Sequence, residues 1–212
     1  YKEHKKNGGT RDEFLYKLLE IPGMYVPKFY DVEYNEDGTI KSFTPNTEKA
    51  PKTIRKVVIT EMDKVFYPEK MLVPLIETVH DRVTLELFRG CIRGCRFCQA
   101  GFVYRPVREK NYDTLIKQAH SLIDASGDDE ISLVSLSTSD YTCFNDLANG
   151  LLDDFAKDKV NISLPSLRID AFSLDLMQKI QEVRKSSLTF AAEAGTQRLR
   201  NVINKNLTED DI

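Results

Sequence analysis

From Val83 onward, short apolar stretches alternate with longer amphipathic ones. Val83, Leu85 and Leu87 recur at every second position, which is the period of a half-buried strand. The amphipathic stretches repeat their apolar residues every three or four positions, as a helix with one buried face does. Strands are therefore predicted over residues 83–87, 131–136, 162–164 and 188–192. Helices are predicted over residues 112–123, 147–155 and 176–183, and from Thr208 onward. Asn111 is expected to cap the first of these helices and Ser173 the third.

The residues before this region follow a different pattern. Thr10 and Glu13 have the spacing of a capping box and stand ahead of an apolar helical face. Apolar stretches beyond that helix predict a β-hairpin and one further strand, over residues 29–34, 39–43 and 54–60. We find no phosphate-binding or metal-binding motif here. Residues 1–80 are therefore expected to be a lead-in or linker with a helix and a hairpin.

Repeated strand-then-helix units imply parallel strands joined by right-handed crossovers. Four units within roughly 130 residues match half to two-thirds of a barrel. We therefore expect an α/β fold, a partial (β/α) TIM-like barrel over residues 81–212, preceded by a small α+β lead-in. The chain begins at Tyr1 and stops at Ile212, just after a helix-start signal, so both ends are expected to be cuts in a longer protein and the barrel to be truncated at its C-terminal side.

Composition narrows the class of protein. Of the 212 residues, 41% are hydrophobic and 30% are charged, an ordinary mixture for a globular protein in water. The formal net charge of −3 gives no electrostatic reason to expect nucleic acid as the main partner. No apolar run has the length needed to cross a bilayer, and no signal-peptide pattern is present. We expect a cytoplasmic protein with no membrane partner.

Three of the four cysteines lie close together. Cys91, Cys95 and Cys98 form a Cys-x-x-x-Cys-x-x-Cys segment at the C-terminal end of the first predicted strand, the edge at which parallel α/β folds hold their active sites. Thiolates bind iron–sulfur clusters and zinc alike. Three thiolates on a cubane leave one iron open to a small chelating substrate, just as an open position marks a catalytic metal site.

Structural zinc is the alternative for the same cysteines. Structural zinc sites usually take their ligands as two pairs separated by a loop. The remaining candidates for ligands are Cys143, His80 and His120, and none of them is paired. Cys143 has the character of a small hydrophobic residue.

The cysteine spacing, with Phe97 just before the last cysteine, resembles the signature of the radical S-adenosylmethionine (SAM) superfamily. The resemblance implies that Cys91, Cys95 and Cys98 bind a 4Fe-4S cluster whose open iron is chelated by the amino acid end of SAM. One electron then breaks a C–S bond and releases methionine and a 5′-deoxyadenosyl radical. Phe97 would support the adenine. The barrel would be of the radical SAM type, with about four of six units present.

Three later segments follow predicted strands in the order that this superfamily has. Residues 135–141 stand where many members have a Gly-Gly-Glu-like motif facing the methionine ammonium; the glycines are absent here, so Ser137, Ser139 and Asp140 would supply the polar contacts. Arg168, in an Arg-x-Asp segment, would pair with the SAM carboxylate, which suits the fork of a guanidinium. Glu193, in a Glu-Ala-Gly segment, would lie near the ribose. No catalytic residue is assigned beyond the cluster.

A narrower resemblance is to an uncharacterised subfamily in which a cobalamin-binding domain precedes the radical SAM barrel. It is carried by segments at 79–82, 89–91, 98–101, 105–109, 163–168 and 194–200. Residues 21–27 resemble the junction that leaves the cobalamin domain. That domain is absent from this sequence, so cobalamin is expected only in a full-length protein and no residue here is assigned to it.

The leading hypothesis is a radical SAM enzyme, or a fragment of one, with an unknown substrate and an electron donor such as flavodoxin or ferredoxin. The first alternative is a methyl or methylthio transferase of the same superfamily acting on RNA or protein. The alternative from another class is a non-catalytic zinc- or iron–sulfur-binding module. Arg105 and Arg108 fit two roles equally well, contacts to a substrate anion or charged residues of a solvated loop.

Overall fold

The computed structural model describes residues 1–76, 78–171, 174–185 and 190–212. It divides into two compact units, an N-terminal unit (Tyr1–Ile59) and a C-terminal unit (Thr60–Ile212). Each unit has its own cluster of buried apolar side chains. Short 3-10 turns connect several elements: η1 (Pro27–Phe29), η2 (Met62–Lys64), η3 (Thr138–Asp140), η4 (Ala156–Asp158) and η5 (Ile169–Ala171).

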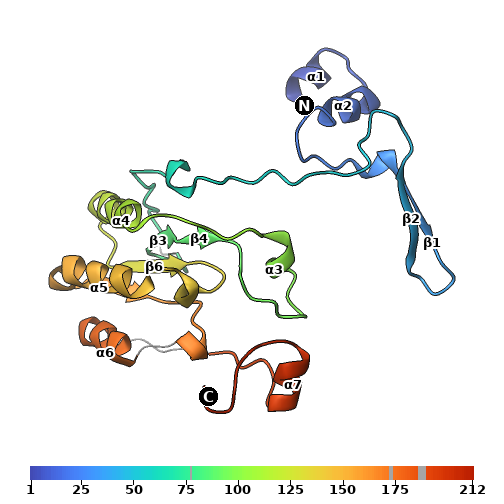
Figure 1. Ribbon diagram of the computed structural model, residues 1–212. Coiled ribbons are helices and arrows are strands. Elements are labelled where there is room, and N and C mark those ends of the chain that lie inside the picture. Colours follow the sequence, from blue (N-terminus) through green and yellow to red (C-terminus); the bar gives the residue numbers. More distant parts are fainter. Residues whose placement is uncertain (77, 172–173, 186–189) are drawn as a thin grey trace. The chain divides into compact units, whose positions relative to one another are not determined.

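The N-terminal unit holds two helices and a β-hairpin, α1 (Lys2–Lys6), α2 (Arg11–Leu18), β1 (Tyr30–Tyr34) and β2 (Ile40–Pro45) (Figure 1). The predicted capping box is confirmed, because Thr10 and Glu13 exchange hydrogen bonds at the start of α2. The hairpin is also confirmed, with antiparallel pairing. The strand predicted over 54–60 is wrong: these residues form neither helix nor strand, and no strand among the described residues pairs with them.

The C-terminal unit is built on a parallel sheet of the order β3-β6-β7. Its strands are β3 (Val83–Glu86), β6 (Glu130–Val134) and β7 (Asn161–Ser163), and the register sets Leu85 beside Leu133 and Ile131 beside Ile162. These apolar residues are all buried in the core of the unit. The expected α/β fold is thus confirmed, with parallel strands consistent with part of a (β/α) barrel.

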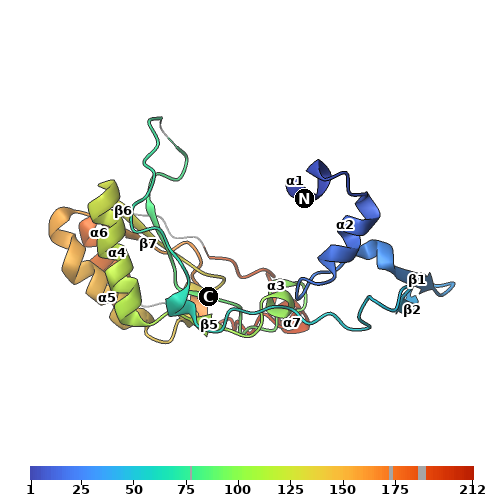
Figure 2. The same ribbon diagram turned by 90° about the horizontal axis from the view of Figure 1, so that it is seen from above.

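Three helices lie together on one side of this sheet, α4 (Tyr112–Ser126), α5 (Phe144–Phe155) and α6 (Leu174–Val183) (Figure 1; Figure 2). Each turns an apolar stripe inward, and Leu115, Leu147 and Ile180 are almost completely buried. Asn111 stands at the cap position of α4 as predicted, but its side chain does not cap the helix. The side-chain amide of Asn111 donates to the carboxylate of Asp63 instead, at 2.6 Å.

The end of the chain differs from the prediction. A helix, α7 (Gln197–Val202), follows Thr196, whose hydroxyl accepts from the amide of Leu199 at 3.3 Å. Thr208 and Asp211 do exchange the hydrogen bonds of a capping box, yet only a turn follows over 209–211. The predicted Ser173 cap lies outside the described residues, as does the start of the predicted strand over 188–192; residues 190–192 form no strand.

Three short elements complete the C-terminal unit. β4 (Phe88–Arg89) pairs antiparallel with β5 (Arg108–Glu109), and α3 (Ala100–Val103) lies between them in the chain. Because β4 follows β3 after one residue, this small ribbon carries the chain from the sheet into the cysteine segment. Within the described ranges, we find no helix with both the length and the apolar character needed to cross a bilayer.

Candidate active site

The cysteine segment is an irregular loop between β4 and α3, at the C-terminal end of the first parallel strand. Gly90 opens it with a φ of +102°, a conformation that strongly favours glycine. A Cβ at this position would lie 2.7 Å from the carbonyl oxygen of Pro106 and 2.8 Å from that of Tyr104. Gly90 is thus required both by the turn and by the close approach of the segment that connects α3 to β5.

Cys91, Cys95 and Cys98 are partly exposed, and none forms a disulfide. The amide of Cys98 donates to the carbonyl of Cys95 at 3.1 Å, which folds that part of the loop back on itself. Three soft thiol donors in one accessible loop suit an iron–sulfur cluster by donor type. Across the residues that the structure describes, however, no three cysteine, histidine or acidic side chains converge on a point as metal ligands do.

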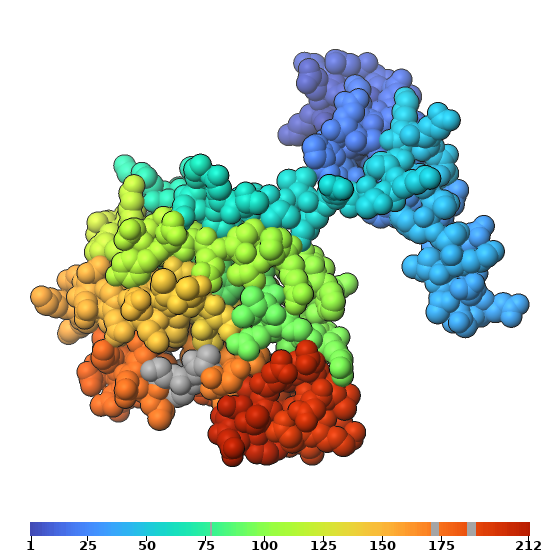
Figure 3. Space-filling model, viewed as in Figure 1, coloured from blue at the N-terminus to red at the C-terminus, as the bar shows by residue number. Residues whose placement is uncertain are grey.

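A segment distant in sequence lies against the cysteine loop. The carbonyl of Ile203, just after α7, accepts from the amide of Arg96 at 2.8 Å. The side-chain amide of Asn204 donates to the carbonyl of Gly94, also at 2.8 Å. In Figure 3 the C-terminal segment, in red, rests directly on the green surface of this loop. The segment that follows α7 is thus brought to the cysteine loop.

Arg93, between the first two cysteines, reaches the end of β6. Its guanidinium donates through Nε to one oxygen of Asp140 at 2.9 Å and through Nη2 to the other oxygen. The Asp140 side chain is 7% exposed. Burial by itself would raise the pKa of Asp140, but the hydrogen bond from Arg93, the nearby Ser137 hydroxyl and the charges of Arg93 and Arg168 outweigh it and lower the pKa. Asp140 is therefore a carboxylate at neutral pH.

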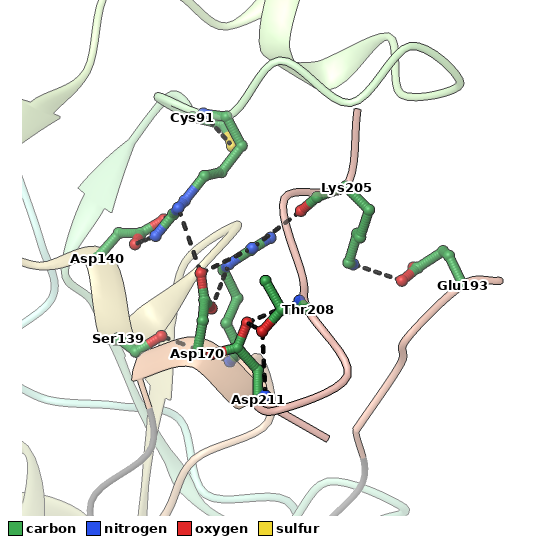
Figure 4. A network of polar contacts seen from close by, with 10 residues as sticks. Cys91, Ser139, Asp140, Asp170, Glu193, Lys205, Thr208 and Asp211 are labelled. Carbon is green, nitrogen blue, oxygen red and sulfur yellow. Dashed lines mark hydrogen bonds and ion pairs between the residues drawn. The ribbon is translucent and has the colours of Figure 1, made fainter. Parts of the chain in front are cut away.

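Arg168 forms the centre of the same network, and its partners Ser139, Asp170 and Lys205 are labelled in Figure 4. Its guanidinium donates to both oxygens of Asp170, at 2.9 and 3.0 Å, and to the carbonyl of Lys205 at 3.1 Å. Its own amide donates to the Ser139 hydroxyl at 3.4 Å. With only 8% of the residue exposed, Arg168 is no surface ion pair. The loop that follows β7 is thereby tied to the loop that follows β6.

Glu193 joins the network through Lys205, with which its carboxylate forms an ion pair. Glu193 has a φ of +62°, a left-handed conformation that is uncommon outside glycine. Such a conformation costs on the order of 1 to 3 kcal/mol and is typically held by its surroundings. The Lys205 ammonium, on a side chain that is 11% exposed, is the partner that holds this carboxylate.

Of the other predicted site residues, Phe97 stands apart from this network and Ser137 borders it at Asp140. Phe97 is 55% exposed on the turn of the cysteine loop. Ser137 is buried beside Asp140, and its hydroxyl lacks a hydrogen bond of good geometry within the described part of the chain, although it lies near enough to Asp140 to influence that pKa. An unpaired buried hydroxyl is costly, so this position suits a ligand that would pair with it.

A cavity of about 440 Å³ opens between the cysteine loop and the β4–β5 ribbon. Its lining combines apolar side chains with the carboxylates of Asp140 and Glu109. Arg105 and Arg108 do not line it. Arg105 donates to the carbonyl of Arg93 at 3.3 Å, and Arg108 donates to the carbonyls of Tyr104 and Pro106. Both arginines thus contact the main chain of their own region.

The structure also identifies three residues to which the sequence had assigned no role. Arg93 contacts Cys91 and Asp140, and Lys205 contacts Arg168 and Glu193. Asp170 joins Arg93 to Arg168. Arg93 lies between the cysteines and Asp170 in the Arg-x-Asp segment, both within motifs that carry the resemblance, while Lys205 lies after α7. Their positions were therefore visible in the sequence, but their partners come from other loops.

Comparison with known proteins agrees with this geometry. A family model described as the radical SAM superfamily matches residues 85–212, the region of the parallel sheet and the polar network. An uncharacterised protein of Methanocaldococcus jannaschii, MJ0966, is 36% identical over 163 residues, which is 72% of this chain. The match covers 35% of MJ0966, so the chain spans about a third of that relative's length. With more than half of its residues in the family match, the chain belongs to the radical SAM superfamily.

Proposed function

We propose that this chain binds a 4Fe-4S cluster through Cys91, Cys95 and Cys98 and acts, as part of a longer protein, in the reductive cleavage of SAM. When bound, the cluster would supply the electron that breaks the sulfonium C–S bond and releases methionine and a 5′-deoxyadenosyl radical. The observation that carries the proposal is that the cysteine loop shares one polar network with the ends of β6 and β7. Membership of the radical SAM superfamily supports the same proposal.

The residues around the loop have suitable chemistry for SAM. Arg168 offers a guanidinium group to a carboxylate, while Asp140 and the Ser137 hydroxyl offer acceptors to an ammonium. We propose that Ser139 and Glu193 contribute from the edges of the same site, and that Phe97 covers the adenine. SAM carries both an ammonium and a carboxylate at its amino acid end, so the two kinds of group would be used together.

The zinc alternative finds less support. His120 lies 3.0 Å from the carboxylate of Asp154, with both residues exposed, and His80 lies 2.8 Å from Arg82. Cys143 packs against the apolar core at the start of α5. Each candidate for a fourth zinc ligand thus has another environment. A cubane with three protein ligands requires no fourth.

Anaerobic reconstitution with iron and sulfide tests the proposal. We expect the chain to take up about one cubane and to give an EPR signal on reduction, and Cys95→Ala to lose the cluster while remaining folded, because the loop lies outside the apolar core. Cys143→Ala is the matched control and should load like the parent. Stoichiometric zinc with no iron uptake, or a full cluster in Cys95→Ala, would contradict the ligand assignment.

The substrate, the electron donor of the flavodoxin or ferredoxin type, a cobalamin-binding domain and a cytoplasmic location stay predictions. Cleavage of SAM by the longer protein is tested by an assay for 5′-deoxyadenosine under reducing, anaerobic conditions. We expect little turnover from the 212 residues alone, since an open site exposes a radical to solvent. Efficient turnover by this chain would contradict that expectation.

A further inference from the structure

We propose that Arg93 is a positioning residue that clamps the cysteine loop to the ends of β6 and β7, and so sets the loop conformation that accepts the cluster. The inference rests on the proposed function and adds a residue that lies between the ligands. It concerns the protein's own contacts, which exist before any cluster is bound.

The clamp has two carboxylate partners on different loops. Arg93 forms a two-point contact with Asp140, after β6, and reaches Asp170, after β7, through Nη1 at 3.5 Å. The side chains are mostly removed from solvent: 25% exposed for Arg93, 7% for Asp140 and 19% for Asp170. Screening by water is weak in such a site, so these pairs hold the loop more firmly than surface ion pairs do.

The main chain of Arg93 is held as well. Its amide donates to the Cys91 sulfur at 3.4 Å, and its carbonyl accepts from Arg105 at 3.3 Å. Gly101 of α3 packs so near that a Cβ there would lie 2.9 Å from this carbonyl oxygen. Arg93 is thus fixed by its side chain on one side and by α3 on the other. Cys91 and Cys95 stand two residues away in either direction, so their positions depend on it.

Asp170 gives the clamp a second consequence. One oxygen of Asp170, which is labelled in Figure 4, accepts from both Arg93 and Arg168, and the other oxygen accepts from Arg168. The cysteine loop and Arg168 therefore share one carboxylate. A change in the cysteine loop, including the uptake of a cluster, would alter the position of Asp170 and with it the position of Arg168.

The geometry requires arginine rather than a generic cation. A guanidinium can bind one carboxylate with two N–H groups and still reach a second carboxylate, whereas an ammonium is a single point of charge on a flexible stem. Arg93→Lys keeps the charge and loses this fork. Arg93→Gln loses both and leaves Asp140 without its guanidinium partner, while Asp170 keeps only Arg168 of its two arginine partners.

Two measurements test the clamp. Hydrogen exchange on the cluster-free chain, followed by mass spectrometry, reports the mobility of peptides covering 90–99 and 138–142. Iron and sulfide per chain after anaerobic reconstitution reports cluster uptake. The matched control is Arg184→Gln, which removes an arginine from an exposed ion pair with Asp129 at the end of α6. Circular dichroism checks that each variant is folded.

We expect Arg93→Gln to raise exchange in both peptides about tenfold and to lower cluster uptake several-fold, with Arg93→Lys between it and the parent. Arg184→Gln should match the parent in both. Unchanged exchange in Arg93→Gln would overturn the clamp, and faster exchange with full uptake would overturn its role in cluster binding. If Arg93→Gln does not fold, parent-like uptake by Arg93→Lys overturns the proposal. If the parent chain itself takes up no iron, the proposed function is refuted. Hydrogen exchange in Arg93→Gln, compared with the parent, then still tests whether Arg93 clamps the loop.

Discussion

Arg168 shows how the surroundings of a residue change the meaning of a short motif. An Arg-x-Asp segment is most often a surface ion pair, and the pairing with Asp170 is local, two residues apart. Here Arg168 is buried and also donates to the carbonyl of Lys205, which lies in a loop 37 positions further along the chain. The burial and the distant contact support the proposal that Arg168 is a site residue.

Replacing Arg168 with alanine should weaken SAM binding without preventing cluster assembly. A charge-assisted hydrogen bond contributes about 1.5 to 3 kcal/mol, which predicts a loss of affinity of roughly tenfold to a hundredfold. Titration calorimetry on the reconstituted, oxygen-free chain measures it, with Arg184→Ala as the control. Equal SAM affinity in Arg168→Ala and the parent would remove Arg168 from the site.

Tyr141, next to Asp140, makes stability sensitive to alkaline pH. Its hydroxyl is buried and donates to the carbonyl of Lys110 at 2.9 Å. Burial, helped by the charges of Cys143, Glu109 and Asp63, raises the pKa of Tyr141 to about 12. Below pH 10 both the folded and unfolded forms carry the proton. As the pH rises from about 10 to 12, only the unfolded form ionises, so folding stability falls.

The Tyr141→Phe variant tests this. It loses one hydrogen bond and should be less stable at neutral pH by about 1 kcal/mol. Its stability should then decline less than that of the parent between pH 10 and 12. Urea unfolding followed by circular dichroism measures both, and Tyr104→Phe, at a half-exposed tyrosine, serves as the control. Parallel pH profiles for Tyr141→Phe and the parent would show that Tyr141 ionises equally in both states.

At the scale of elements, apolar periodicity predicted the helices whose stripes face the sheet. In α5 the predicted positions Leu147, Leu151 and Leu152 are all buried, and the helix begins three residues before the first of them. The same pattern missed α7, which is short and buries an arginine, Arg200, against main-chain carbonyls instead of an apolar stripe. Periodicity detects hydrophobic faces, so a helix held by polar contacts escapes it.

Leu147→Ala tests how much the apolar face of α5 contributes. Leu147 is completely buried in the core between helix and sheet, so the truncation should cost about 2 to 5 kcal/mol of unfolding free energy. Leu174→Ala, at the exposed start of α6, should change stability by less than about 0.5 kcal/mol. Urea unfolding compares the two. A small effect at Leu147 would mean that α5 is not part of the cooperative core.

At the scale of the whole molecule, the chain forms two units with separate apolar cores. Residues 51–60, which include the boundary between the units, contain neither helix nor strand, and Lys52 and Arg55 are exposed there. Limited trypsin digestion should cut first at these two residues and leave a fragment that begins near residue 56. Mass spectrometry identifies the cuts. Earlier cleavage inside β3, β6 or α5 would contradict the two-unit description.

The sequence by itself determined the fold class, the positions of the sheet strands and the spacing of the thiols, because these depend on residues that are near one another in the chain. Alternation and turn chemistry are local properties, and so is the order of the motifs. The prediction of a strand over 54–60 was wrong because a strand also needs a partner strand, and the local sequence does not reveal one.

Only the tertiary structure decided which of these motifs meet. Arg93, Asp170 and Asn204 are polar residues whose pairing depends on strand order and on loops up to 110 positions apart. Hydrogen bonds and ion pairs form over a few ångströms, so no pattern along the chain specifies them until packing of the apolar core brings the loops together.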